Sequence, residues 1–205
     1  QWNKLIQICK KNKINFLCSP FSIEAINILE KLKVKRYKIP SGEITNIPYL
    51  KKISKTNKNC ILSTGMSNWK EIEKAVKLFN RKKLVLMQCS SIYPCPPKNV
   101  GLNIITEFKK KFNLEVGFSD HSEGIAASLA AVTLGATIIE KHLTFSKAMY
   151  GSDAKFATEP TQFKNYCNSL MEANKILSTK DTLVYSIQYL LQDQKKMLLD
   201  YLLTK

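Results

Sequence analysis

The chain has 205 residues, enough for one folded domain or for part of a larger one. No apolar run reaches membrane-spanning length, so the composition indicates a globular protein. The net charge of +16 comes almost wholly from lysine, because Arg36 and Arg81 are the only arginines. Base recognition depends heavily on arginine, so we interpret this charge as a solvated basic surface and keep a basic nucleic-acid-binding module as an alternative.

The six cysteines are spread along the chain, and no two of them form a Cys-x-x-Cys pair. Several lie in apolar runs, where cysteine packs as a small hydrophobic residue. No secretory signal begins at Gln1. We therefore expect a reduced, cytoplasmic setting, with neither membrane nor nucleic acid as a partner.

Short β-type runs alternate with amphipathic helical stretches, after Trp2–Cys9, which we interpret as part of a helix that is already under way. The predicted strands are Ile14–Cys18, Arg36–Ile39, Cys60–Ser63, Leu84–Gln88, Glu115–Phe118 and Thr137–Lys141. The predicted helices are Ile23–Leu32, Tyr49–Lys55, Trp69–Phe79, Leu102–Phe112, Ile125–Leu134 and Thr161–Ile176. This alternation predicts an α/β fold with a parallel sheet, because each helix returns the chain to the start of the next strand.

Polar residues follow nearly every predicted strand. A (β/α)8 barrel needs polar groups at the carboxyl end of every strand, whereas an open doubly wound sheet concentrates them at one switch point. We therefore predict a (β/α)8 TIM barrel that is incomplete, with about six βα units and with the first two strands missing before Gln1. Residues 1–177 would form this partial barrel, and residues 178–205 a C-terminal helix or a linker toward an absent domain.

The segment Lys38-Ile-Pro-Ser-Gly-Glu43 combines a cation, a hydroxyl, a glycine and a carboxylate directly after a strand. Lys38 and Ser41 are candidates to hold a phosphate, and Glu43 is a candidate to bind a sugar hydroxyl or transfer a proton. Ser63-Thr-Gly65 after the next strand is typical of an anion cradle. Ser19, Ser91 and Ser119 stand at equivalent strand ends. The alternative for each serine is a helix cap.

His121 and His142 are the only histidines, and each ends a predicted strand, one βα unit apart. Consecutive strand ends of a parallel sheet meet at one edge, so the two rings are expected to converge as a metal site. The alternative is a pair of hydrogen-bonded histidines without a metal. Asp120 and Glu140 flank the pair, and Glu140 is a candidate to orient one of the rings.

Two further residues lie on loops that follow strands. Tyr93 begins the proline-rich loop Tyr93-Pro-Cys-Pro-Pro97, which is predicted to hold its ring over the barrel mouth. Asp153 adds a carboxylate to the loop after His142.

Together these motifs resemble the sialic acid synthase family, the phosphoenolpyruvate-dependent N-acetylneuraminate synthases. The resemblance runs in unbroken order from about Leu5 to Phe163. The matching segments are Phe16–Ser22, Tyr37–Asn46, Ile61–Met66, Cys89–Pro94, Gly117–His121 and Ile139–His142.

The resemblance implies a (β/α)8 barrel followed by a small antifreeze-like domain, in a homodimer. It implies a transferase that forms a C–C bond between phosphoenolpyruvate and N-acetylmannosamine or a related amino sugar, with release of phosphate. The product would be sialic acid or a close nonulosonate such as legionaminate. The segment Lys38–Asn46 looks like the sialic and legionaminic branches, because the pseudaminic branch typically lacks the Ser-Gly pair.

The resemblance also implies roles for residues at the strand ends. His121 and His142 would bind Mn²⁺, or another divalent cation such as Mg²⁺ or Co²⁺. The residues implied to hold phosphoenolpyruvate are Ser19, Lys38, Ser41, Ser63, Ser91 and Ser119. Those implied to contact the amino sugar are Glu43, Tyr93 and Asp153, and Glu43 is grouped with the two histidines as catalytic. Family members also use residues on the strands and the domain that are absent here, so a catalytically inactive truncated fragment is the alternative.

Overall fold

The computed structural model describes residues 1–178, and the tail predicted over 178–205 lies outside these residues after Ser178. The strands are β1 Arg36–Ile39, β2 Asn59–Ser63, β3 Leu84–Cys89, β4 Glu115–Asp120 and β5 Ile139–Lys141. The helices are α1 Trp2–Lys11, α2 Ile23–Lys31, α3 Ile47–Ser54, α4 Trp69–Val76, α5 Asn103–Phe112, α6 Ala126–Thr133 and α7 Pro160–Ser178. Within the described part of the chain, no helix is both long and apolar enough to cross a bilayer.

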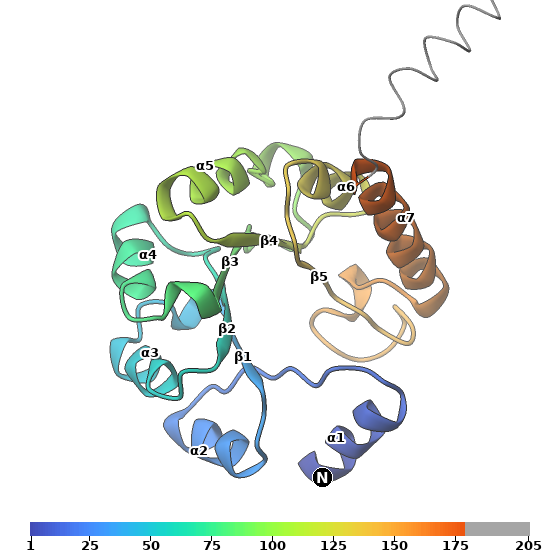
Figure 1. Ribbon diagram of the computed structural model, residues 1–205. Helices are drawn as coiled ribbons and strands as arrows, with labels where there is room; N and C mark the ends of the chain where they lie inside the picture. Colours follow the sequence, from blue (N-terminus) through green and yellow to red (C-terminus); the bar gives the residue numbers. More distant parts are fainter. Residues whose placement is uncertain (179–205) are drawn as a thin grey trace, which may run out of the picture.

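The five strands form one parallel sheet in the order β1-β2-β3-β4-β5. Every strand therefore lies beside the strand that follows it in the sequence. The sheet is curved, and helices α2 to α7 surround its outer side (Figure 1). This arrangement is part of a (β/α)8 barrel, as the alternation of strands and helices predicts.

The local sequence explains where several helices begin. The side chains of Ser22 and Asn46 accept hydrogen bonds from backbone N–H groups in the first turns of α2 and α3. Asn68 and Glu71 form a capping box at the start of α4. These side chains pair backbone donors that a helix start otherwise leaves unsatisfied.

The two faces of the sheet differ because side chains alternate along each strand. The outer face is apolar and packs against the helices, with Tyr37, Leu62, Leu86, Val116 and Phe118 all buried there. The inner face is polar near the carboxyl ends of the strands. There Ser119 of β4 lies in register between Cys89 of β3 and Glu140 of β5, so the three side chains share the inner face.

The predicted strand at Ile14–Cys18 is wrong. Phe16 and Cys18 do pack against the core, so the alternation of apolar residues reflects real burial. The segment nevertheless forms no ladder with the sheet, because its one backbone hydrogen bond to β1 runs from Lys38 N to Cys18 O over 3.2 Å. The described sheet therefore has five strands, rather than the predicted six.

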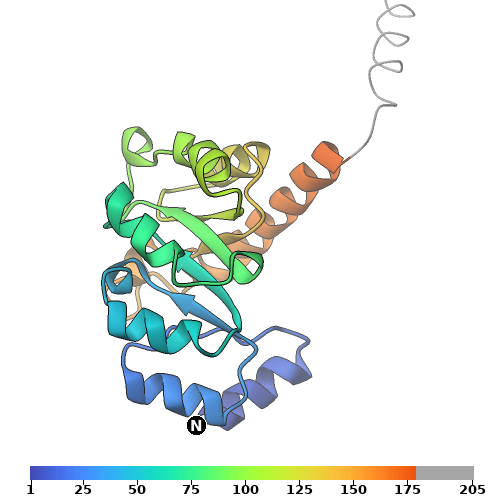
Figure 2. The same ribbon diagram turned by 60° about the vertical axis from the view of Figure 1, so that its left-hand side comes forward.

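Helix α7 extends beyond the barrel. Its C-terminal half projects away from the sheet (Figure 2), and Met171, Ile176 and Leu177 are more than half exposed there. Tyr166 is its buried residue. The first half of α7 is therefore the part that is anchored to the barrel.

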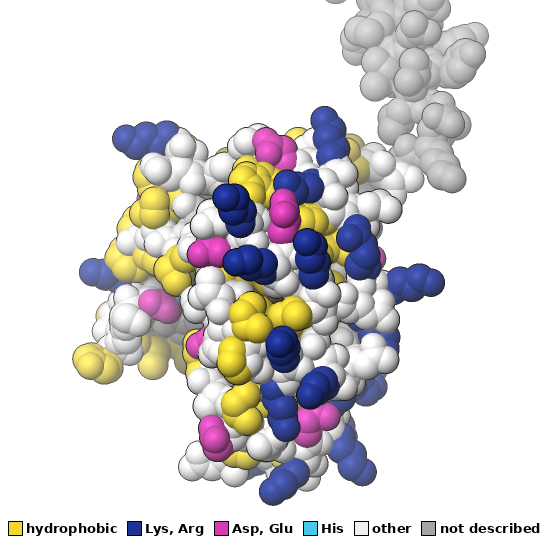
Figure 3. All heavy atoms as spheres, turned by 90° about the vertical axis from the view of Figure 1, so that its left-hand side faces the viewer, with side chains coloured by type: hydrophobic (Ala, Val, Ile, Leu, Met, Phe, Trp, Pro, Cys, Tyr) yellow, Lys and Arg dark blue, Asp and Glu magenta, His cyan; other side chains and the backbone are white. Residues whose placement is uncertain are grey.

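Basic side chains are spread over the outer helices. Figure 3 shows one side of the molecule, where lysine and arginine side chains lie from top to bottom among acidic and apolar ones. The charge on this face forms no single block, which is how a solvated basic surface is arranged.

Candidate active site

The carboxyl ends of the strands border one pocket, with a volume of about 580 Å³. It is lined by every residue predicted to hold phosphoenolpyruvate, by both histidines and by Tyr93. These residues are Ser19, Lys38, Ser41, Ser63, Ser91, Tyr93, Ser119, His121 and His142. Residues that stand at separate strand ends in the sequence therefore meet at one site.

Ser63, at the end of β2, is the clearest free hydrogen-bonding group in the pocket. Its side chain is buried, and its Oγ atom has no hydrogen-bond partner among residues 1–178. Buried hydroxyl groups are normally paired, so an unpaired one that lines a pocket is suited to bind a ligand.

A cation and a carboxylate face each other inside the pocket. Lys38 Nζ lies 3.1 Å from Glu140 Oε1, and the lysine side chain is only 10% exposed. The same Glu140 oxygen accepts a hydrogen bond of 2.7 Å from Ser119 Oγ. Two predicted phosphate ligands are thus held by an internal anion, which an incoming phosphate would have to replace.

Ser41 and Gly65 connect the ends of β1 and β2. Ser41 Oγ accepts a hydrogen bond of 2.9 Å from the Gly65 backbone N–H. A Cβ atom at Gly65 would lie only 2.7 Å from Ser91 Oγ, so glycine permits the close approach of these loops. The backbone turn at Gly65 therefore lies close to two predicted phosphate ligands, Ser41 and Ser91.

The two histidines converge as expected. Their ring centroids lie 5.2 Å apart, and the Tyr93 ring lies 4.1 Å from the His121 ring and 5.7 Å from the His142 ring. His121 Nδ1 lies 2.8 Å from the carbonyl oxygen of Ser90, which can only accept, so this nitrogen is the donor. His142 Nδ1 lies 3.4 Å from Asp153 Oδ2.

These surroundings suit a divalent cation. With Nδ1 of His121 protonated and Nδ1 of His142 beside a carboxylate, Nε2 of each ring is left to act as a ligand. Burial, and then the neighbouring His121, lower the pKa of His142, which favours the neutral form that binds metals. Within residues 1–178, no group of three or more histidine, cysteine or acidic side chains is arranged so that it could hold a metal ion by itself. The pair therefore fits a cation that takes its other ligands from water or substrate.

Two residues predicted to contact the sugar are absent from the pocket lining. Glu43 Oε2 accepts a hydrogen bond of 2.8 Å from Asn46 Nδ2, beside the first turn of α3. Asp153 lies outside the lining as well, although it contacts His142. Their roles toward the sugar stay predictions.

The pocket also contains residues that were not predicted as ligands. They are Phe21, Pro40, Gly42, Met66, Cys89, Glu140 and Lys141. Strand periodicity is the signal that finds Glu140, because it stands two positions before His142 and shares its face. Glu140 was expected to orient a histidine ring, but its hydrogen-bonding and ion-pair contacts are with Lys38 and Ser119.

This chain is similar in sequence to curated synthases from bacteria and animals. The N,N'-diacetyllegionaminic acid synthase of Campylobacter jejuni is 46% identical over 179 residues, which are 85% of this chain and 54% of that protein. The human N-acetylneuraminate-9-phosphate synthase is 33% identical over 183 residues, 87% of this chain and 51% of that protein. The chain thus spans about half the length of these curated relatives.

Solved structures agree with the barrel architecture. The sialic acid synthetase of Leptospira borgpetersenii superposes with a TM-score of 0.84 at 33% identity, covering 92% of this chain and 68% of that one. A truncated 3-deoxy-D-arabino-heptulosonate 7-phosphate synthase of Thermotoga maritima gives a TM-score of 0.74 at 18% identity, which shows a shared fold alone. The model of the NeuB family matches residues 1–182. This chain, with its polar barrel mouth and paired histidines, is therefore a member of the NeuB family.

Proposed function

We propose that the protein is a nonulosonate synthase that condenses phosphoenolpyruvate with an N-acetylated amino sugar and releases phosphate. The observation that carries the proposal is the single pocket in which Lys38, unpaired Ser63 and the histidine pair meet. The named relatives are synthases of legionaminic and sialic acids, which supports this reaction class.

In this proposal the phosphate and carboxylate of phosphoenolpyruvate lie among Lys38 and the serine hydroxyls. Charge-assisted hydrogen bonds from Lys38 stabilise the anion, and Ser63 gains the partner that it lacks. The C2–C3 double bond of phosphoenolpyruvate supplies the electron pair for a bond from C3 to the sugar aldehyde carbon, whose oxygen takes up a proton and becomes a hydroxyl. Water adds its oxygen at C2 and gives up a proton, and the C–O bond to phosphate breaks, which leaves a 2-keto acid and phosphate. Lys38 and the hydroxyls stabilise the charge on the departing phosphate.

His121 and His142 would hold the divalent cation, with Mn²⁺ as the first choice. When bound, such a cation acts as a Lewis acid on the carbonyl oxygen of the sugar. The Tyr93 ring packs against both histidines, and in this proposal it limits their movement. In this proposal Tyr93, Asp153 and Glu43 contact the amino sugar, and the 46% identity to a legionaminic acid synthase supports a 2,4-diacetamido sugar as the first substrate to test.

The experiment is a phosphate-release assay with phosphoenolpyruvate, Mn²⁺ and one amino sugar at a time. We compare N-acetylmannosamine with a 2,4-diacetamido sugar, and Lys38→Met with wild type. Loss of a charged hydrogen bond typically costs about 1.5–3 kcal/mol, so the variant should raise KM for phosphoenolpyruvate by about tenfold or more.

Lys58→Met is the matched control, because Lys58, just before β2, pairs with Glu30 of α2 at 2.6 Å and does not line the pocket. It should leave the KM for phosphoenolpyruvate unchanged. Absence of phosphate release with every sugar would contradict the proposal. Retained binding of Mn²⁺ and phosphoenolpyruvate in that case would identify a binding-competent but inactive fragment.

A further inference from the structure

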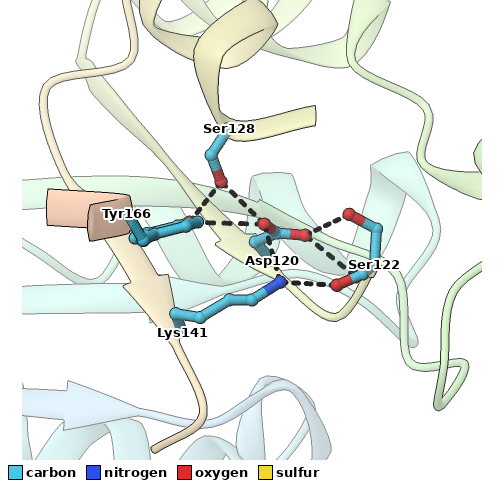
Figure 4. A network of polar contacts seen from close by, with 5 residues as sticks. All are labelled: Asp120, Ser122, Ser128, Lys141 and Tyr166. Carbon is cyan, nitrogen blue, oxygen red and sulfur yellow. Dashed lines mark hydrogen bonds and ion pairs between the residues drawn. The ribbon is translucent and has the colours of Figure 1, made fainter. Parts of the chain in front are cut away.

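A buried polar network lies at the carboxyl ends of β4 and β5, on the side of the sheet that faces α6 and α7 (Figure 4). It joins the ends of β4 and β5 to α6 and α7. We call its residues the strand-end clamp, and they are Asp120, Ser122, Ser128, Lys141 and Tyr166. Two of them, Asp120 and Lys141, immediately precede the predicted metal ligands His121 and His142.

The centre of the strand-end clamp is an ion pair. Lys141 Nζ lies 3.0 Å from Asp120 Oδ2, and the side chains are 5% and 0% exposed. The two residues are register partners on neighbouring strands. Lys141 also donates a hydrogen bond to the carbonyl oxygen of Ser122. The pair therefore joins the two strand ends at the point where the sheet opens into the pocket.

Hydrogen bonds from three sides hold the Asp120 carboxylate. Oδ1 accepts from the backbone N–H of Ser122 over 2.9 Å and from its hydroxyl over 2.6 Å. Oδ2 accepts from Ser128 Oγ on α6 over 2.7 Å and from the Tyr166 hydroxyl on α7 over 3.3 Å. The Ser128 and Tyr166 oxygens also lie within hydrogen-bond distance of each other, but each hydroxyl has one proton, so a bond between them forms in place of one of the two bonds to Oδ2. This saturation offsets the cost of burying a charge and fixes the carboxylate in one place.

Fixing the Asp120 and Lys141 side chains also fixes the direction of the side chains that follow them, His121 and His142. Because successive side chains of a strand alternate, anchoring Asp120 and Lys141 in the network with α6 and α7 directs His121 and His142 toward the pocket, which Lys141 also borders. Strand β5 has only three residues, none of which is fully buried, so apolar packing restrains it weakly. The ion pair to β4 is accordingly a strong local restraint on where His142 lies relative to His121.

We propose that the strand-end clamp positions His121 and His142 and thereby sets the affinity of the pocket for a divalent cation. Asp120 and Tyr166 are positioning residues in this scheme, since neither lines the pocket that holds the histidines. The proposal rests on the proposed function, because that function assigns the cation to the two rings.

The test measures two properties of the same variants. Mn²⁺ affinity is measured by calorimetry, and the imidazole rings are observed by long-range ¹H–¹⁵N NMR without metal. Only two histidines occur in the chain, so each ring signal is assigned by one substitution. Asp120→Asn should weaken Mn²⁺ binding by about tenfold to a hundredfold, as loss of a residue that orients a ligand typically does.

Tyr166→Phe and Ser128→Ala keep the ion pair and guard against a failure of Asp120→Asn to fold. Each should weaken Mn²⁺ binding by about twofold to tenfold, the effect of one hydrogen bond. Both should shift the imidazole signals in the metal-free protein and leave the affinity for inorganic phosphate unchanged. A merely structural role would leave the signals and the Mn²⁺ affinity in place.

Tyr37→Phe is the matched control, because Tyr37 is a fully buried tyrosine whose hydroxyl bonds to a carboxylate, that of Glu30, away from the histidines. It should alter neither the imidazole signals nor Mn²⁺ affinity. The positioning role would be overturned if every variant of the strand-end clamp bound Mn²⁺ as tightly as the wild type and kept its imidazole signals. Failure of the wild type to bind Mn²⁺ would instead overturn the proposed cation site, and with it the role in cation affinity.

Discussion

Lys38 and Glu140 form an ion pair of 3.1 Å, although they come from the first and the last strand of the sheet. Adjacent strands lie about 4.8 Å apart, so in a flat five-stranded sheet β1 and β5 would be separated by about 19 Å. Two side chains cannot span that distance. The pair forms because the sheet curls, and it places a carboxylate among the groups that would bind phosphate.

Removing the charge of this carboxylate should strengthen anion binding. In Glu140→Gln, Lys38 loses its internal counter-ion, while the amide oxygen can still accept from Ser119. We expect the affinity for inorganic phosphate to rise by several-fold, up to about tenfold, which corresponds to about 1.4 kcal/mol. The free energy of unfolding should fall, because the nearly buried Lys38 is left unpaired. Calorimetry at low ionic strength and urea unfolding measure the two effects.

Glu73→Gln is the control for this prediction. Glu73 pairs with Lys111 at 2.7 Å on the outer helices, where the side chains are 37% and 45% exposed. Exposed ion pairs contribute at most about 1 kcal/mol, so this change should have little effect on stability and none on phosphate binding. Unchanged or weaker phosphate binding in Glu140→Gln would show that Glu140 does not compete with the ligand.

The positions of polar residues after the strands were enough to predict which residues share the pocket, because the geometry of a parallel sheet does not depend on side-chain detail. The carboxyl ends of parallel strands lie on one edge, so hydroxyls and imidazoles that follow different strands must meet there. Ser63, Ser119 and His121 did so. The strand predicted at Ile14–Cys18 failed on a different requirement, because an extended segment also needs a continuous ladder with its neighbour.

Contacts across the curve of the sheet could not be predicted. The partner of Lys38 is Glu140, and that choice depends on how tightly the strands curl. The distance of Glu43 from the pocket depends on the 3-10 turn over Ser41–Glu43, which brings its carboxylate to Asn46. The hydrogen bond from Tyr166 to Asp120 depends on how α7 docks, and no local pattern encodes that.

Substitutions of Tyr93 should separate the roles of its ring and its hydroxyl. Tyr93→Phe keeps the ring that lies 4.1 Å from His121, so Mn²⁺ affinity should stay unchanged. If the hydroxyl contacts the sugar, KM for the sugar should rise by about twofold to tenfold. Tyr93→Ala removes the ring and should weaken Mn²⁺ binding by about tenfold. Calorimetry measures the Mn²⁺ affinity of both variants, and steady-state kinetics measures the KM for the sugar. Equal Mn²⁺ affinity in Tyr93→Phe and Tyr93→Ala would contradict a role for the ring in packing the histidines.

Alkaline pH should destabilise the fold through buried acids. Burial raises the pKa of Cys60 to about 12 from 9.0, and it raises the pKa of Tyr49 above its usual 10.0. A folded-state pKa above the unfolded value contributes stability below the unfolded pKa, and this stability is lost as the pH rises. The free energy of unfolding should therefore gain a downward contribution above about pH 9 from Cys60 and above about pH 10 from Tyr49.

Tyr49→Phe isolates this effect from the titration of the many lysines. At neutral pH the variant should be less stable by about 1 kcal/mol, because Tyr49 donates a buried hydrogen bond of 2.6 Å to the Pro20 carbonyl. The difference between wild type and variant should shrink as the pH rises above about 10. Urea unfolding at several pH values measures it, and a constant difference would count against the raised pKa of Tyr49.

Gly65→Ala should damage both stability and phosphate binding. The new Cβ atom would lie 2.7 Å from Ser91 Oγ, 2.9 Å from Cys89 Sγ and 3.0 Å from the Cys89 carbonyl oxygen. The serine can rotate away, but the carbonyl belongs to the end of β3, so the strand end has to shift. Overpacking of this kind typically costs about 1–3 kcal/mol.

Gly42→Ala is the stability control, since its Cβ atom would only meet the flexible Met66 side chain at an ordinary 3.5 Å. Its free energy of unfolding should stay within about 0.5 kcal/mol of the wild type. In Gly65→Ala, the strand shift moves Ser91, and the Gly65 N–H that bonds Ser41 is displaced as well. Phosphate affinity should therefore fall together with stability, and a Gly65→Ala protein that equals wild type in both would mean that this turn is looser than its contacts indicate.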